Sequence, residues 1–184
     1  MSTKYKATQP NTGYYVTLTT VGWVDVFTRP QQKDMLIKNL QFCQKEKGLE
    51  IYAYCIISNH FHMLCKAIGD ISLPEIMRDF KKFTSKEVIK NILAEPESRR
   101  DWMLRYFEDA CYRLKRNQKY KVWQDGYHAE HLFSSKFIQQ KLKYIHYNPV
   151  KERIVDRPED YLYSSARNYV GLQGELEVVI LDLI

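Results

Sequence analysis

The sequence has 184 residues, of which 45% are hydrophobic, and 28 Lys and Arg against 22 Asp and Glu give a formal net charge of +6. These proportions indicate one globular domain over residues 1–184. The sequence also excludes a membrane-spanning protein, because no apolar run approaches the roughly 20 residues of a bilayer span. The N-terminus lacks the apolar segment of a signal peptide, so we expect a cytoplasmic protein with no membrane association, whose four cysteines are buried thiols: Cys43, Cys55, Cys65 and Cys111.

The first half of the chain predicts three strands and two long helices. Gly48 is a typical helix stop, and Ser72 is a typical N-cap. The polar pair Ser58-Asn59 predicts a tight hairpin between two strands, with one longer strand as the alternative. The predicted strands cover 14–20, 50–57 and 60–66, and the predicted helices cover 31–47 and 73–93.

The second half predicts shorter elements. Ser134 is a good cap for a helix over 135–147, which Asn148-Pro149 should end because the residue before proline avoids the α region. The other predictions are a helix at 102–114 and strands at 122–128 and 176–183. The order of elements favours an α+β class, with a ferredoxin-like βαββαβ antiparallel sheet, helices on one face and a further C-terminal helix.

The tripeptide His60-Phe61-His62 is the sharpest local feature of the sequence. In a strand, residues i and i+2 leave by the same face, so the two imidazoles lie side by side while Phe61 points into the core. Two such imidazoles can share one divalent metal ion, although the pair also arises by chance.

The helix predicted at 135–147 has two different stripes. Ile138, Leu142 and Ile145 form an apolar stripe that should dock on the sheet. On a neighbouring face, Tyr144 and Asn148 are one turn apart, so an amide oxygen could complete a metal site beside a phenol. The alternative is that Tyr144 is a half-buried aromatic residue and Asn148 is a helix C-cap.

Four motifs follow one another in the chain: Ser58-Asn59-His60-Phe61-His62-Met63-Leu64, Val122-Trp123-Gln124, Tyr144-Ile145-His146-Tyr147-Asn148-Pro149-Val150-Lys151 and Tyr163-Ser164-Ser165. In this order, over roughly residues 14–170, they resemble the REP-associated tyrosine transposases, which are single-tyrosine HUH transposases. The combination is far more specific than any of its parts. The family often has proline where this chain has Ser58, a departure that affects the stiffness of the turn and no metal ligand.

The resemblance implies a ferredoxin-like core, often assembled as a homodimer. It also implies that His60, His62 and Asn148 hold Mg²⁺ or Mn²⁺, a donor set that suits these ions as well as the zinc that histidines usually signal. Tyr144 would attack the scissile phosphate and form a covalent 5′-phosphotyrosine. The substrate would be single-stranded DNA with palindromic hairpins.

Several other residues could take part in this chemistry. Tyr147 is a rival nucleophile, but it projects about 100° away from Asn148 around the helix, so we assign it to packing. Lys141 and Lys143 are candidates to help a phenol ionise. Three further histidines could bind phosphate or orient ligands, but we interpret them as polar surface residues: His128, His131 and His146.

The excess positive charge lies in one central segment. From Arg78 to Lys121 there are 13 basic and 7 acidic residues, a difference equal to the net charge of the whole chain. Cations interleaved with Tyr112 and Tyr120 are typical of phosphate contacts combined with base stacking. The predicted DNA-binding residues are Lys81, Lys82, Lys86, Arg113, Lys115, Arg116, Lys119 and Lys121.

The leading hypothesis is therefore a metal-dependent transposase that nicks and rejoins single-stranded DNA. Two alternatives stay open. One is a non-catalytic protein, derived from such a transposase, that binds hairpin DNA or RNA. The other is a metallohydrolase unrelated to DNA, which would leave the central basic segment unexplained.

Overall fold

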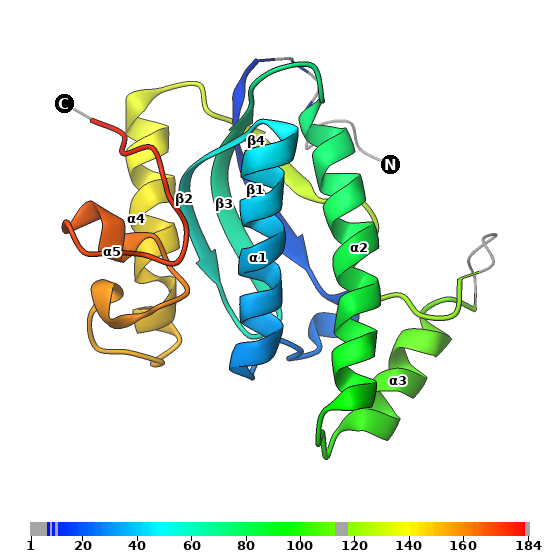
Figure 1. The fold of residues 1–184 in the computed structure, drawn as a ribbon. Helices are drawn as coiled ribbons and strands as arrows, with labels where there is room; N and C mark the ends of the chain where they lie inside the picture. The colour runs from blue at the N-terminus through cyan, green and yellow to red at the C-terminus, as the bar shows by residue number, and fades with distance from the viewer. Residues whose placement is uncertain (1–6, 8, 10, 113–117, 183–184) are drawn as a thin grey trace.

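Four strands form one antiparallel sheet in the order β2-β3-β1-β4 (Figure 1). The computed structural model describes residues 7, 9, 11–112 and 118–182. The strands are β1 (Gly13–Thr19), β2 (Leu49–Ile56), β3 (His60–Ala67) and β4 (His128–His131). Together with the helices between them they give the predicted βαββαβ order, and the α+β class is confirmed.

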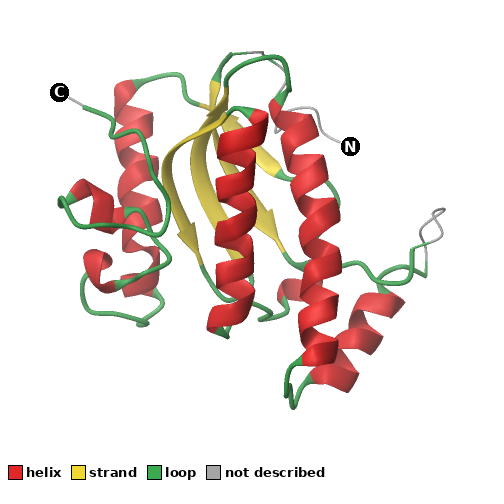
Figure 2. Cartoon of the chain, in the orientation of Figure 1, coloured by secondary structure: helices red, strands yellow, loops and turns green. Residues whose placement is uncertain are grey.

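Helices lie on both faces of this sheet. Helix α1 (Pro30–Lys47) and helix α2 (Leu73–Ala94) cover one face, and α4 (Ser135–Lys151) packs against β2 and β3 from the other (Figures 1 and 2). Helix α3 (Arg100–Asp109) follows α2. Short helical segments complete the fold: η1 (Val21–Trp23), η2 (Pro158–Asp160) and α5 (Ala166–Tyr169).

Strand alternation divides the buried side chains into two clusters. Val16 and Phe61 belong to the cluster under α1 and α2, whereas Tyr15 and Leu64 face α4 and meet Ile145. Ile138 and Leu142 pack against the second cluster. The predicted apolar stripe of this helix therefore docks on the sheet, on the face opposite α1 and α2.

Phe61 fixes the position of the strand segment that carries both histidines. Its side chain is fully buried, and its ring lies 5.6 Å from the ring of Phe80 and 6.1 Å from that of Trp123. We expect Phe61→Ala to lower the free energy of unfolding by about 3–5 kcal/mol, because the cavity left behind adds to the lost burial. Urea denaturation followed by circular dichroism measures this loss, and exposed Phe42 provides the matched Phe→Ala control.

The ends of three helices follow the predicted signals. Gly48 ends α1 with φ 67°, a left-handed conformation that favours glycine. Ser72 and Glu75 form a capping box at the start of α2, and the Ser134 hydroxyl accepts a hydrogen bond from Phe137 N at the start of α4. The hairpin at Ser58-Asn59 is also confirmed, so the single longer strand is wrong.

Four predicted boundaries are wrong. Helix α3 ends at Asp109, short of the predicted end of its helix, and residues 110–112 form turns. Helix α4 does not end at Asn148 but continues through Pro149 to Lys151, because a proline in the last turn removes only one helical donor. Residues 122–127 form no strand, and Trp123 makes an isolated bridge to Thr20. The described part of 176–183 is also not a strand. It runs beside β2, where Val179 N donates a hydrogen bond to the Ile51 carbonyl. The neighbouring Tyr52 carbonyl accepts a hydrogen bond from the Tyr169 hydroxyl instead.

The four cysteines are unpaired and buried, as predicted. Across the residues that the structure describes, no helix combines the length and apolar character needed to cross a bilayer.

Candidate active site

His60 and His62 project from β3 toward α4, with their ring centroids 4.7 Å apart. The strand alternation that buries Phe61 on the opposite face places both imidazoles on this one. The prediction that His60 and His62 share one face of the strand is therefore confirmed.

Two hydroxyl groups of β1 orient His62. Tyr15 Oη and Thr17 Oγ1 each lie 2.8 Å from His62 Nδ1, and the Tyr15 ring stacks on the imidazole at 5.5 Å. Burial, aided by neighbouring cationic groups, lowers the pKa of His62 to about 3. The imidazole is thus neutral near pH 7, the form in which a ring nitrogen can bind a metal ion.

The other ring nitrogen, His62 Nε2, is buried and has no hydrogen-bond partner among the described residues. An unpaired buried nitrogen is costly unless it meets a ligand. Within the same residues, no group of three or more His, Cys, Asp and Glu could hold a metal ion. A metal at His60 and His62 would therefore need a different kind of third donor, such as an amide oxygen.

A turn network orients His60. Its Nδ1 lies 2.6 Å from Asn59 Oδ1. Asn59 Nδ2 donates to Asp25 Oδ1 at 2.9 Å, and the Ser58 hydroxyl donates to the same oxygen at 2.5 Å. Burial lowers the pKa of His60, and the carboxylate of Glu152 opposes that shift. Ser58 thus holds the turn through a hydrogen bond to Asp25.

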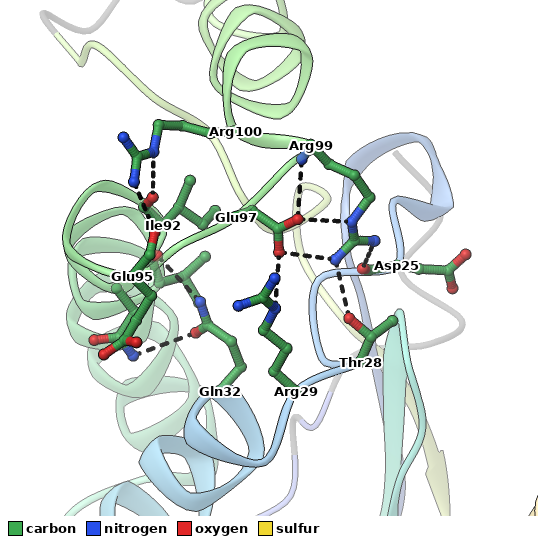
Figure 3. Close-up of polar contacts among 11 residues, drawn as sticks. Asp25, Thr28, Arg29, Gln32, Ile92, Glu95, Glu97, Arg99 and Arg100 are labelled. Atoms are coloured by element: carbon green, nitrogen blue, oxygen red, sulfur yellow. Dashed lines mark hydrogen bonds and ion pairs between the residues drawn. The ribbon is translucent and has the colours of Figure 1, made fainter.

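The network continues to the junction of α2 and α3 (Figure 3). The guanidinium of Arg99 donates to the Asp25 carbonyl at 2.8 Å and to Thr28 Oγ1 at 2.9 Å. Glu97, whose side chain is 7% exposed, pairs with both Arg99 and Arg29. The loop carrying Asp25 is therefore fastened to a charged cluster outside the sheet.

Tyr144 lies directly beside the histidine pair. Its ring centroid is 5.2 Å from that of His62, and the side chain is 43% exposed. The rival Tyr147 is also exposed, but the contact found for its ring is with Lys143 Nζ at 5.9 Å. Of the two phenols, Tyr144 is the one that the fold brings to His62.

Asn148 follows Tyr144 by one turn of α4 and is buried. It lies inside the helix, where its carbonyl accepts a hydrogen bond from Glu152 N, so the interpretation as a C-cap is wrong. One turn before Asn148, Tyr144 contacts His62, and one turn after it, Glu152 acts electrostatically on His60. Asn148 therefore lies on α4 between the turn that contacts His62 and the turn whose carboxylate acts on His60.

A cavity of about 370 Å³ opens beside Tyr144. Lys141 Nζ donates to Glu130 at 2.8 Å and lies 4.1 Å from the centroid of the Tyr15 ring. Burial would raise the pKa of Glu130, but hydrogen bonds from Lys141 and His128 lower it below its usual value. The residues lining the cavity are Tyr15, Thr17, His128, Glu130, Gln140, Lys141 and Tyr144.

This arrangement can be compared with known proteins. The family model described as "Transposase IS200 like" matches residues 9–112, more than half of the chain. The chain belongs to the IS200-like transposase family. The matched part includes both histidines, whereas Tyr144 and Asn148 lie beyond it.

A solved structure shares the fold of this transposase. A REP-associated tyrosine transposase bound to a REP hairpin superposes with a TM-score of 0.65 at 19% identity, covering 100% of this chain and 96% of that one. A transposase from Deinococcus radiodurans R1, described as putative, gives a TM-score of 0.47 at 15% identity, covering 79% and 98%. No curated protein sequence matches the chain.

The remaining histidines of the transposase have separate places. His128 lines the cavity beside Tyr144, and His131 lies against the Tyr14 ring at 5.9 Å. The prediction of a surface residue is wrong for His146, which is buried, bonds to Ser165 Oγ at 2.9 Å and has its pKa lowered by burial to about 4.

The predicted DNA-binding residues do not gather around Tyr144. Lys82 and Lys86 line a cavity of about 860 Å³ between α1 and α2, across the sheet from the histidine pair. The Lys81 ammonium donates to the carbonyls of Gln124 and Gly126. Their role in DNA binding stays a prediction.

The other members of that set lie farther along the chain. Lys121 pairs with Asp125 at 2.7 Å, and Lys119 lies over the ring of Tyr120 at 5.2 Å. Arg113, Lys115 and Arg116 are outside the described residues.

Two motifs of the transposase prove to be structural. The buried Trp123 donates through Nε1 to Thr84 Oγ1 at 2.9 Å, and Gln124 N donates to the Thr19 carbonyl. Ser165 bonds to the backbone of Tyr54 through its own N and Oγ, and it also meets His146. These motifs fasten the ends of β1 and β2, next to the site.

Sequence reasoning missed three residues of the site: Tyr15, Thr17 and Asp25. Tyr15 and Thr17 share a strand face, and two hydroxyl side chains at positions i and i+2 of a strand were a usable signal. No local pattern marks Asp25, because its partners Ser58 and Asn59 are far away in the sequence.

Proposed function

We propose that this transposase nicks and rejoins single-stranded DNA through a covalent 5′-phosphotyrosine at Tyr144. The observation that carries the proposal is the buried His62 Nε2, which has no hydrogen-bond partner among the described residues, on the imidazole whose ring centroid lies 5.2 Å from that of Tyr144. The solved relative, bound to a REP hairpin, supports hairpin DNA as the substrate class. A homodimer stays a prediction, which light scattering can test.

His60, His62 and Asn148 would hold Mg²⁺ or Mn²⁺. Two imidazoles and an amide oxygen fit a divalent ion, and the costly unpartnered nitrogen supports this assignment. When bound, the ion polarises the scissile phosphate and stabilises negative charge on its oxygens. The β1 hydroxyls keep His62 in place, and Asn59 does the same for His60.

Tyr144 supplies the nucleophile. Its phenolate oxygen bonds to phosphorus as the bond from phosphorus to the 3′ oxygen breaks, and that oxygen takes up a proton and leaves as a 3′-hydroxyl. The 5′-phosphate stays on the tyrosine. A 3′-hydroxyl of another strand then attacks the phosphotyrosine and releases Tyr144, so rejoining needs no nucleotide cofactor.

An adduct assay tests the proposal. The protein is incubated with Mn²⁺ and labelled single-stranded hairpin DNA from the flanks of its own gene, and denaturing gels separate any covalent product. We expect an adduct that EDTA prevents and that peptide mass spectrometry places on Tyr144. Tight binding without an adduct under any divalent metal would overturn the catalytic proposal and leave the non-catalytic alternative.

The orientation of His60 by Asn59 gives a separate prediction. Asn59→Ala removes the partner of His60 Nδ1, so we expect Mn²⁺ affinity to fall about 10- to 100-fold. Isothermal titration calorimetry measures the affinity without DNA. Asn39→Ala is the matched control, since that amide bonds only within α1 in the contacts described, and an equal loss in both variants would contradict the role of Asn59.

A further inference from the structure

Two phenylalanine rings stack on the surface at the start of α4. The centroids of Phe133 and Phe137 are 4.6 Å apart with an interplanar angle of 25°, and Phe133 is 68% exposed. Isolated apolar residues on a surface need no explanation, but an aromatic stack that keeps an open face is suited to bind another planar group.

Cationic side chains lie around this stack, one of which, Lys141, is paired with Glu130. Lys141 Nζ lies 5.1 Å from the centroid of the Phe137 ring. Helix α4 carries four lysines and no acidic residue: Lys136, Lys141, Lys143 and Lys151. Because no carboxylate offsets the partial positive charge of its first turn, this end of the helix favours a polyanion.

The stack lies in line with the proposed nucleophile. Phe137 and Tyr144 are seven residues apart on α4, so they share a helix face and are separated by roughly 10 Å along the axis. Gln140, Lys141 and Tyr144 line the cavity of about 370 Å³ on that same stretch of helix. An aromatic and cationic track therefore leads from Phe133 to the site.

We propose that unpaired bases of the DNA strand next to the cleaved phosphate stack on Phe133 and Phe137. Lys136 and Lys143, both exposed on α4, neutralise the phosphates of that strand. Unpaired bases present the π-faces that such rings bind, and stacking with interleaved cations is typical of proteins that bind single strands. This inference rests on the proposed function, since it places the strand that Tyr144 would cut.

Photocrosslinking tests the proposal directly. Single 5-iodouracil substitutions are placed along the flank of a hairpin oligonucleotide, and the full-length protein is irradiated with it in EDTA, so that no cleavage occurs. We expect crosslinks, mapped by mass spectrometry, at Phe133 or Phe137 from a short run of positions. Crosslinks at other sites only, or none from any position, would overturn the proposal.

Binding affinity provides the second readout. We expect Phe133→Ala to weaken binding of the flanked hairpin about tenfold, as for one lost stack, and to leave the affinity for a hairpin without flanks unchanged. Leu172→Ala is the control, because Leu172 is a large apolar residue, 47% exposed after α5 and away from both cavities. An equal loss for both hairpins, or equal effects of both variants, would contradict stacking of the flank.

The outcome is independent of the adduct assay. If wild-type protein forms the adduct but Phe133 affects neither crosslinks nor affinity, the stacking track is wrong and the proposed function stands. If no adduct forms while the flank still crosslinks to Phe133, stacking is supported and the catalytic proposal fails.

Discussion

Replacing Tyr144 with phenylalanine should reduce the covalent adduct at least about 10³-fold, because the change removes only the hydroxyl that would bond to phosphorus. The phenylalanine ring can keep the contact with His62, and the side chain is 43% exposed, so we expect the fold and the DNA affinity to be unchanged. Gel quantification of the adduct, with fluorescence anisotropy for binding, separates the two effects.

Tyr147→Phe is the control for this substitution. Tyr147 is 52% exposed on the same helix and loses the same single oxygen. We expect adduct formation within about twofold of wild type, the range of a surface change away from the site. An adduct that persists in Tyr144→Phe and disappears in Tyr147→Phe would assign the chemistry to Tyr147.

Replacing His62 with alanine should weaken Mn²⁺ binding at least about 100-fold, since it removes a proposed ligand and not merely a partner of one. Its Nε2 is buried and has no hydrogen-bond partner in the part of the chain that the structure describes. Calorimetry with Mn²⁺ measures the affinity, and circular dichroism checks the fold. Because removing a buried side chain also perturbs packing, His62→Leu tests the same ligand with less loss of volume and without supplying another donor atom.

His131→Ala is the matched control for the metal prediction. That histidine is exposed at the end of β4 and contacts the Tyr14 ring, so its loss should leave Mn²⁺ affinity unchanged. Unaltered affinity in both His62 variants would rule out His62 as a ligand.

The sequence predicts most of the fold because its signals are local. Apolar alternation identifies β1 and β3, and Gly48 and Ser72 mark helix ends through the backbone geometry that they favour. The end of α4 is different, because packing of the last turn outweighs the local preference of the residue before Pro149. Contacts with the rest of the fold therefore determine where α4 ends.

The candidate site divides in the same way. The pair His60 and His62 is visible in three consecutive residues, because strand geometry alone puts them together. The hydroxyls that hold His62 come from a strand 45 and 47 positions earlier in the chain. Such contacts depend on which strands become neighbours, and a single sequence shows this only through the whole topology.

The C-terminal segment also covers the exposed edge of the sheet. β2 is an edge strand. Backbone groups on its outer side form hydrogen bonds with four residues of the C-terminal segment: Tyr163, Ser165, Tyr169 and Val179. An uncovered edge of this kind is a template on which another chain can add a strand and begin aggregation. A chain cut before Tyr163 would expose that template, so the tail that follows the proposed nucleophile also shields β2 from strand addition by another chain.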